Sequence, residues 1–310
     1  MLWSTDLGRA GVHSVHVRGK RIAAGNYDGS AALLDDAGVI LAEARVHDGA
    51  VTGVMLTQTD QLITTSRDTR IGILEVPSLE RVAVLEGHRG WITKLRAIDG
   101  GFMTVGEDGL AIAWDGATLR ERWRGQVQGP VWGLAVSPDG KSAFTGTAPR
   151  AWRADDGRES ELHVQFERAA AAAAASEGGD GVLLCSGNDR GEVNAYSVPN
   201  ERLNWTHSGK GTTSLTVLGG PEGRAVVGRQ DGGVVLHHGA ERMDLAGEHG
   251  AMAYCSAAVG SGGFATGGFD GRIVVRDWRG EIRKELAYPD GPFIFSLAAA
   301  PDGSRVLVAG

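Results

Sequence analysis

Residues 87–115 read GHRGWITKLRAIDGGFMTVGEDGLAIAWD, a stretch of short apolar runs separated by tight turns. Residues 91–97 alternate apolar and polar side chains, as expected of a strand whose two faces meet different surroundings. Residues 102–115 predict two further strands joined by a hairpin turn at Asp108, and residues 120–124 predict a more polar fourth strand. The stretch therefore predicts one small antiparallel sheet with packed inner strands and a solvent-exposed outer edge.

A turn like the one at Asp108 recurs along the whole chain. The distances between successive turn aspartates are 40, 40, 81, 42 and 39 residues, and the distance of 81 spans two periods with a degenerate turn between them. A period in this range is a signature of propeller blades, so we expect an all-β fold: a β-propeller of four-stranded antiparallel blades, forming a single domain over residues 1–310. The turns are centred on Asp28, Asp68, Asp108, Thr147-Ala148, Asp189, Asp231 and Asp270.

The first stretch also resembles a blade of the WD-repeat family. Gly87-His88 precedes the first strand, Thr104 lies in the second, Asp108 in the turn, and Trp114-Asp115 ends the third. The resemblance implies that the His, Thr, Asp and Trp side chains form a buried hydrogen-bonded set that stabilises the blade. It covers the full length of the chain, although only this blade carries every element. Two other blades keep most of the set: His47, Thr64 and Asp68 with Leu74 in place of Trp, and His249, Thr266 and Asp270 with Arg276 there.

A His–Asp pair is also how enzymes orient a general base. Here the pair recurs in three blades at structural spacing, and no nucleophile is near it in the sequence. The pattern therefore favours a structural role for these histidines.

The blade count follows from the predicted third strands, which lie near residues 30–34, 70–74, 110–114, 150–153, 192–196, 233–237 and 272–276. Residues 293–298 and 305–308 are typical of a first and a second strand, and the fragment Leu2-Trp3-Ser4-Thr5 of a fourth. We therefore expect eight blades with the last stitched from both termini, a pairing that would leave no open seam; seven blades are the alternative. The eighth blade lacks a third strand in the sequence, so it is either incomplete or completed by a strand of a partner.

In one segment, the helix propensity of the residues conflicts with the strand that the repeat predicts. Residues 169–175 are all alanine and favour a helix by propensity alone. They also fall where the fifth blade needs its first strand, and small side chains suit a crowded innermost strand. We expect a strand there, with a short helix or a disordered insert as the alternative.

Composition narrows the classes of function. The net charge of −7, from 31 basic and 38 acidic residues, argues against a general nucleic-acid surface, where a basic stripe is expected. Neither a signal peptide nor an apolar run of about 20 residues is visible, so we expect a cytoplasmic protein without a membrane segment. Cys185 and Cys255 lie in strand-like runs and are expected to be buried free thiols. The scarcity of lysine beside abundant alanine and glycine hints at a bacterial source, and we expect a chain that is monomeric by itself.

Propeller enzymes usually place their chemistry at the central channel or on one face, so catalytic side chains would be expected on the predicted inner strands. None of these strands contains Asp or Glu, which counts against a metal site and a carboxylate pair, and no Gly-x-Ser-x-Gly motif is present. We expect no catalysis, no metal and no cofactor. An alternative function, a propeller enzyme or small-ligand sensor, would bind an anionic metabolite in the channel through His13, His16, Lys94 and Arg96.

Large side chains recur where the chain enters the first strands and just before the turn aspartates. Aromatic rings and arginine are enriched at interface hot spots, so these positions predict a partner-binding top face. The alternative is that the rings fill the ends of the core between blades. We expect a protein-interaction scaffold that binds a protein or peptide, within a multi-component assembly in one version of the hypothesis. The predicted contact residues are Trp91, Met252 and Phe293; Trp132, Tyr254 and Phe295; and Tyr27, Arg67 and Phe269.

Overall fold

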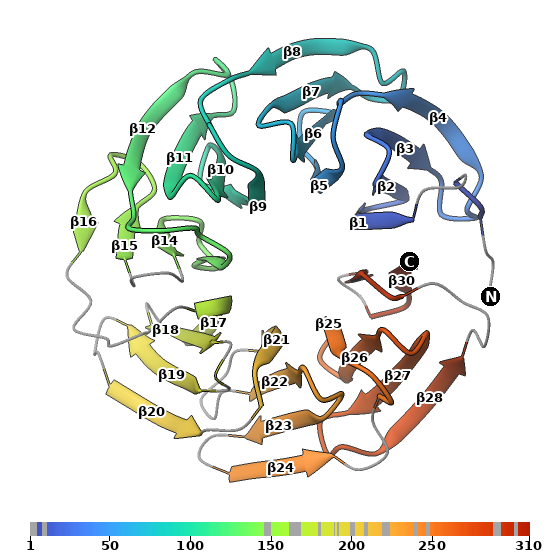
Figure 1. Cartoon of the computed structure of the whole chain (residues 1–310), viewed down its shortest axis with the longest axis vertical. Coiled ribbons are helices and arrows are strands. Elements are labelled where there is room, and N and C mark those ends of the chain that lie inside the picture. Colours follow the sequence, from blue (N-terminus) through green and yellow to red (C-terminus); the bar gives the residue numbers. More distant parts are fainter. Residues whose placement is uncertain are drawn as a thin grey trace.

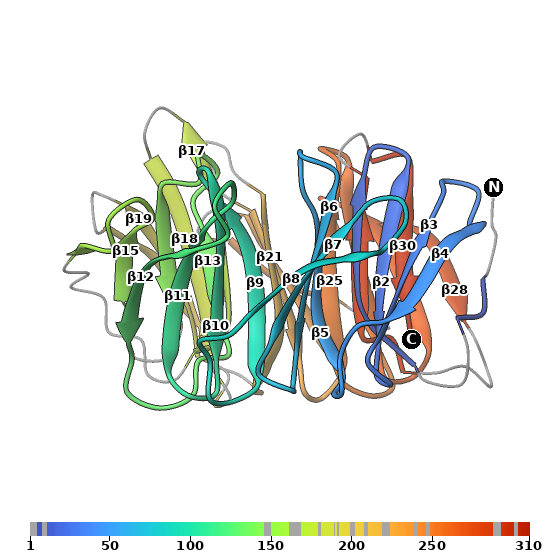
Figure 2. The ribbon, with the colours of Figure 1, turned by 90° about the horizontal axis from the view of Figure 1, so that it is seen from above.

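The computed structural model shows a ring of small β-sheets around a central channel, as Figure 1 shows in face view. Seen from its edge in Figure 2, the ring is a disc whose innermost strands run between two faces. The structure describes residues 5–7, 11–145, 150–160, 169–178, 181–188, 190, 192–198, 202–207, 210–218, 224–238, 241–245, 249–287, 293–300 and 303–310. The degenerate turn predicted at 147–148 and the fragment at 2–4 lie outside these ranges.

Blade 3 shows how the sequence builds each sheet. It pairs β9 (Ile92–Ile98), β10 (Gly101–Gly106), β11 (Leu110–Asp115) and β12 (Glu121–Gln126) in antiparallel order from the channel outward. The two middle strands are almost completely buried, while the polar outer strand is largely exposed. Gly100 and Gly109 follow Asp99 and Asp108 with φ of +64° and +75°, values that favour glycine in tight turns.

The other blades repeat this order. Blade 1 contains β1 (Val12–Arg18), β2 (Arg21–Asn26), β3 (Ser30–Leu34) and β4 (Ile40–Arg45). Blade 2 contains β5 (Val51–Leu56), β6 (Gln61–Ser66), β7 (Ile71–Glu75) and β8 (Arg81–Leu85). Blade 4 contains β13 (Leu134–Val136), β14 (Ser142–Thr145), β15 (Arg150–Arg153) and β16 (Glu159–Ser160). Blade 5 contains β17 (Ala169–Gly178), β18 (Gly181–Asn188), β19 (Val193–Val198) and β20 (Arg202–His207). Blade 6 contains β21 (Thr212–Leu218), β22 (Arg224–Arg229), β23 (Val234–His238) and β24 (Glu241–Leu245). Blade 7 contains β25 (Ala253–Val259), β26 (Gly263–Gly268), β27 (Arg272–Asp277) and β28 (Ile282–Ala287), and β29 (Ser296–Ala299) pairs with β30 (Val306–Ala309).

The predicted blade count is wrong. Among the described residues, seven sheets have four strands, whereas the sheet between β25 and β1 has only two, β29 and β30. Eight four-stranded blades are therefore not formed. The seven-blade alternative also fails, because residues 293–300 and 303–310 stay in the ring and do not pack elsewhere. Two strands can fill the inner part of the wedge because Leu307 packs against Ile22 and Ala24 of blade 1. We call this two-stranded sheet the short blade.

The short blade covers its neighbours less completely than the other blades do. Val306 and Val308 of β30 are partly exposed, and so is Val275 of β27, which faces the short blade. Residues at the same register in complete blades are at most 4 % exposed, since a third strand covers them. The residues equivalent to Val306 and Val308 of β30 are Ile22, Ala24, Leu62, Thr64, Phe102, Thr104, Phe264 and Thr266. The residues equivalent to Val275 are Leu33, Ile73 and Ala113.

The alanine run forms β17, an innermost strand paired with β18, so the expectation of a strand at 169–175 is confirmed. Helix propensity fails here because a blade requires a first strand at this place in the repeat. Tertiary context commonly overrides propensity in this way.

Threonine hydroxyls connect the innermost strands of neighbouring blades. The Thr52 hydroxyl donates to the carbonyl of Ile92, and the Thr93 hydroxyl donates to the carbonyl of Val131. In blade 6 the Thr213 hydroxyl donates to the carbonyl of Ala253 in the same way. Each of these hydrogen bonds joins one blade to the next, so the inner ring is held by side chains as well as by apolar packing.

Candidate functional site

A β-bulge near the start of the first strand positions the side chains of the candidate site. In blades 1, 2, 3, 6 and 7 the register skips one residue there, and a bulge re-aims the side chain that it contains. The bulge holds Thr52, Thr93 and Thr213 in blades 2, 3 and 6. It holds an aromatic ring, His13 or Tyr254, in blades 1 and 7. Phe295 occupies the equivalent place in the short blade, where its amide donates to the carbonyl of Ala309.

These rings and their neighbours form one connected group, which we call the aromatic cluster: Tyr27, Tyr254, Phe269, Phe293 and Phe295. The ring of Phe269 lies 4.8 Å from that of Tyr254 and 4.7 Å from that of Phe293, measured between centroids. The ring of Phe295 contacts the other four edge-on, at 5.4–6.1 Å. These distances are typical of favourable aromatic pairs, so blades 1 and 7 and the short blade present a single aromatic surface.

Arg67 extends this surface towards blade 3. Its guanidinium carbon lies 4.5 Å from the centroid of the Trp91 ring and 5.5 Å from that of Tyr27. Both distances are in the range of cation–π contacts. Within the described chain, Arg67 has no carboxylate partner, so its charge is held by the two rings.

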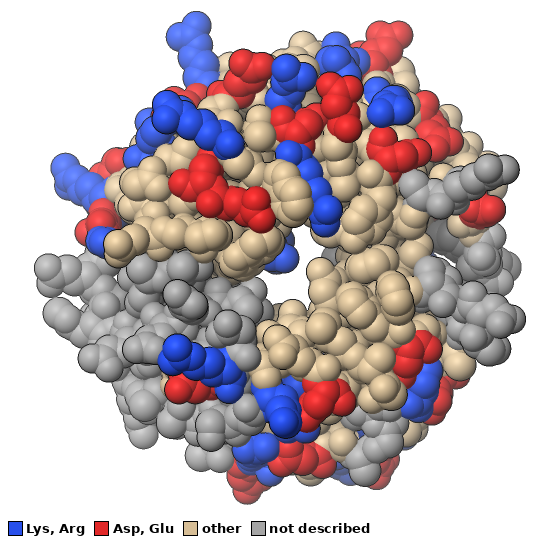
Figure 3. Space-filling model, viewed as in Figure 1, with Lys and Arg blue, Asp and Glu red and all other residues tan. Residues whose placement is uncertain are grey.

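Part of this surface is open to solvent. Phe293 is 53 % exposed, while the other four members of the aromatic cluster are half-buried; Trp91, beside Arg67, is 43 % exposed. Burial raises the pKa of Tyr27 and of Tyr254, so both phenols stay neutral at physiological pH. In Figure 3 the surface beside the channel over β1, β30 and β25 shows neither basic nor acidic atoms among the residues drawn in colour. The aromatic cluster itself is uncharged and carries two hydroxyl groups, so it suits an apolar or aromatic ligand group, while Arg67 places a positive charge at its edge.

Two of the predicted contact residues make no ring contact with this group among the described residues. Trp132 is 45 % exposed in blade 4, and no ring of the described residues stacks on it. Met252 is half-buried, and its carbonyl accepts the amide hydrogen of Phe269. The structure therefore brings seven of the nine predicted contact residues together, counting Arg67 and Trp91 with the five rings.

The four residues predicted to line the channel divide into two groups. His13 belongs with the aromatic residues, because its ring stacks on Phe295 at 6.2 Å and meets Tyr27 edge-on at 5.1 Å. His16 accepts a hydrogen bond from the amide of Leu56 on Nδ1, at 3.2 Å. Lys94 and Arg96 lie on β9, the innermost strand of blade 3. The sequence reading missed Arg18, which lies close enough to His16 to lower the pKa of that histidine after the larger effect of burial.

The residues predicted to form the hydrogen-bonded set of blade 3 are in contact. Trp114 Nε1 donates to Thr104 Oγ1 at 2.9 Å, and Thr104 Oγ1 lies 2.9 Å from His88 Nε2. His88 Nδ1 lies 3.0 Å from a carboxylate oxygen of Asp108, which also accepts the amides of Arg89 and Leu110. The pattern assigns a neutral imidazole with its proton on Nδ1.

Blades 2 and 7 repeat this arrangement without the tryptophan. His47 lies between Thr64 and Asp68 at 2.9 Å from each, and His249 lies 3.1 Å from Thr266 and 2.9 Å from Asp270. Register places Leu74 opposite Leu62 and Arg276 opposite Phe264, just as Trp114 lies opposite Phe102. The nitrogens of these histidines are already used within the blade, so the geometry fits a structural role.

Acidification is expected to destabilise the ring through its buried histidines. Burial is the largest cause that lowers the pKa of His13 (to about 4), His16, His47 and His88 below the ordinary value of 6.5. The unfolded chain then binds protons below pH 6.5 that the folded chain does not, so stability is full above that pH. It is lost as pH falls towards the folded values, by at most about 1.4 kcal/mol per pH unit for each histidine.

Urea midpoints measured at pH 7.5, 6.5 and 5.5 would check this. They should fall mainly in the lower interval. Equal midpoints at pH 7.5 and 5.5 would contradict the assignment of neutral buried histidines.

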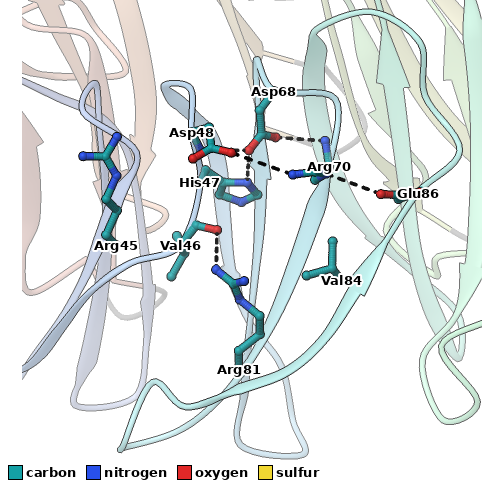
Figure 4. A pocket seen from close by; sticks show the side chains of 9 residues that line it. All are labelled: Arg45, Val46, His47, Asp48, Asp68, Arg70, Arg81, Val84 and Glu86. Atoms are coloured by element: carbon teal, nitrogen blue, oxygen red, sulfur yellow. Dashed lines mark hydrogen bonds and ion pairs between the residues drawn. The ribbon is translucent and has the colours of Figure 1, made fainter.

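An open hollow of about 420 Å³ lies between the outer parts of blades 1 and 2, as Figure 4 shows. Several of its charged groups are held by partners within the hollow. Arg70 lies 3.8 Å from Asp48 and 3.4 Å from Glu86, and Arg81 donates to the carbonyl of Val46 at 3.1 Å. Three basic and three acidic side chains share the hollow, so it shows no excess of charge for a ligand.

Other kinds of site find no support in the described part of the chain. No group of three or more His, Cys, Asp or Glu side chains within the described ranges could hold a metal ion. Burial raises the pKa of the Cys255 thiol, so this cysteine stays protonated and unreactive, while the side chain of Cys185 lies outside the description. None of the described residues forms a helix long and apolar enough to cross a membrane.

Comparisons with known proteins find similarity of structure only. No family model and no curated protein matches the sequence. The crystal structure of the computationally designed Ika8 protein is similar with a TM-score of 0.82 and 18 % identity, over 97 % of this chain and 94 % of that one. Sqt1 of Chaetomium thermophilum, bound to the N-terminus of the ribosomal protein L10, is similar with a TM-score of 0.79 and 16 % identity, over the same shares. At identities this low, the similarity is one of fold.

Proposed function

We propose that this chain is a WD-repeat-like propeller that binds a partner protein or peptide on its aromatic cluster and performs no catalysis of its own. The observation that carries the proposal is the cluster itself. Five rings from two blades and the short blade meet on one surface, and Phe293 is 53 % exposed there. Rings that merely filled the core would be buried, as Phe264 is at 0 % exposure.

The other features are consistent with this proposal. The complete His88–Thr104–Asp108–Trp114 set supports the WD-repeat likeness, although no family model matches the chain. Sqt1 has a similar fold and was crystallised with the N-terminus of a ribosomal protein, so a propeller of this shape can receive a peptide. We further propose that the protein works in the cytoplasm and that its partner belongs to a larger assembly.

Affinity purification from the native cell tests the proposal. Wild type is compared with the double variant Trp91→Ala, Phe293→Ala, and bound proteins are identified by mass spectrometry. A partner present in stoichiometric amount with wild type is expected to be lost, because hot-spot rings typically contribute about 2 kcal/mol or more, roughly thirtyfold in Kd.

Trp132→Ala is the matched control, since Trp132 is as exposed as Trp91 but, unlike Trp91, is not joined to the aromatic cluster through Arg67. Its complex should survive. Equal loss in the control would show that binding does not depend on the cluster, and the absence of a stoichiometric partner in the wild-type sample would count against a scaffold.

A further inference from the structure

Cationic side chains line part of the central channel. Lys94 and Arg96 lie on β9, which is innermost in blade 3 and flanked by blades 2 and 4. Because both sides of this strand are covered by neighbouring blades, its partly exposed Lys94 and its exposed Arg96 reach solvent in the channel. Basic atoms are visible beside the channel opening in Figure 3. Arg18 of β1 joins them from blade 1, where its side chain donates to the carbonyl of Thr57.

These groups are close enough to act on one another. The pKa of Lys94 is lowered to about 8 by burial and by the charge of Arg96. The pKa of His16 is lowered by burial and then by Arg18 and Arg96. No carboxylate of the described chain raises the pKa of Lys94 or forms an ion pair with Arg18, Lys94 or Arg96. Like charges without a counter-charge are unfavourable in a confined space, and an anion would relieve them.

The basic side chains in the channel contrast with the acidic character of the rest of the molecule. The chain carries a net charge of −7, yet the innermost strands β1, β5, β9, β13, β21, β25 and β29 contain neither Asp nor Glu. Glu177, near the end of β17, is the one acidic residue in the sequence of an innermost strand. Acidic residues are thus concentrated away from the channel. The basic side chains in the channel therefore produce a positive potential that attracts anions.

We propose that the channel binds a small molecule with two or more phosphate or carboxylate groups. Lys94 and Arg96 are two residues apart on one strand, so their backbone positions are separated by about 7 Å and can each meet one anionic group. His16 adds a donor, because its Nδ1 accepts the Leu56 amide and its proton is therefore on Nε2. The side chains of this site are different from those of the aromatic cluster, so each set can be substituted without the other.

Pyrophosphate and citrate are the probes, used against sodium chloride of equal ionic strength. Titration calorimetry is expected to show saturable binding of at least one of them to wild type. Lys94→Met and Arg96→Met should each weaken it about tenfold or more, because each removes one charged hydrogen-bond donor. The ratio of the two affinities tells a phosphate site from a carboxylate site. Arg120→Met, an exposed arginine of the same blade, is the control and should bind as wild type does.

A second readout separates a specific site from general screening by salt. An anion beside Lys94 would raise its pKa, so binding at pH 8 should take up protons, measured from the dependence of the heat on buffer ionisation enthalpy. Lys94→Met should abolish that uptake. The proposal is overturned if neither probe binds, or if both channel variants bind as tightly as Arg120→Met. Phe293→Ala should leave probe binding unchanged, so failure here is distinguishable from failure of the proposed scaffold.

Discussion

Asp108→Ala is expected to lower the free energy of unfolding by about 3–5 kcal/mol, because it removes a buried carboxylate that accepts several hydrogen bonds at once. The carboxylate is only 8 % exposed and accepts the amides of Arg89 and Leu110 as well as the proton on His88 Nδ1. Burial alone would raise the pKa of Asp108, but these hydrogen bonds and the histidine outweigh burial and keep it below its usual range. Alanine would leave three donors without this acceptor, among them the buried Nδ1–H of His88, and an unsatisfied buried donor is costly.

Urea unfolding followed by circular dichroism would measure this effect, and hydrogen exchange would show whether β10 and β11 lose their protection first. Asp231→Ala is the matched control. Asp231 occupies the same turn position in blade 6, where it is 38 % exposed and accepts Gly233 N and Arg229 Nε at 3.1 Å each. No histidine set depends on it among the described residues, so we expect a loss below about 1 kcal/mol. Equal losses in the two variants would show that the histidine set does not stabilise blade 3.

Phe264→Ala is expected to destabilise the protein by about 3–5 kcal/mol, whereas Phe293→Ala should cost less than about 1 kcal/mol. Phe264 is fully buried between blades 6 and 7, where its ring lies 5.3 Å from that of Trp278. Removing the ring leaves a cavity that the surrounding strands cannot close. Phe293 has more than half its surface in water, so its removal takes away little packing.

Thermal and urea unfolding of the two variants decides between the alternatives for the aromatic residues. A small effect of Phe293→Ala, together with loss of a partner, means that the ring is kept for binding. If Phe293→Ala destabilises the fold as much as Phe264→Ala does, the rings serve to fill the ends of the core, and the proposed binding surface is wrong.

The repeat could be read from the sequence because each blade carries its own local signals. The third strand expected near 110–114 is β11, and the turn at Asp108 precedes it as predicted. The short blade could not be counted correctly in the same way. Whether two strands suffice in the last wedge depends on side chains such as Leu307 packing across to blade 1, and local patterns do not report such contacts.

The aromatic cluster could be predicted in part because equal register places side chains at equal depth in the ring. Tyr254 and Phe295 share one position in successive blades, and they do meet, at 5.8 Å. Trp132 shares that position too, but blade 4 is too far round the ring for its side chain to join. The repeat register predicts in which strand a residue lies and how far along the channel axis it lies. Contacts between side chains of different blades also depend on the curvature of the ring, which the register does not give. The stacking of His13 on Phe295 could not be predicted from the sequence for the same reason.

The residue at the β-bulge position of the first strand couples ligand binding to closure of the ring. Thr52, Thr93 and Thr213 use this position to bind the next blade, but blade 1, blade 7 and the short blade carry rings there and lack that hydrogen bond from a threonine. Besides the backbone hydrogen bond from Val12 to Gly310, the seam of the ring is thus joined by ring contacts, and these rings are also the surface offered to a ligand. A ligand that contacts Tyr27, Phe295 and Phe269 together would connect blade 1, the short blade and blade 7 across the seam. The affinity of such a ligand would then depend on the free energy of closing the ring as well as on the contacts between ligand and protein.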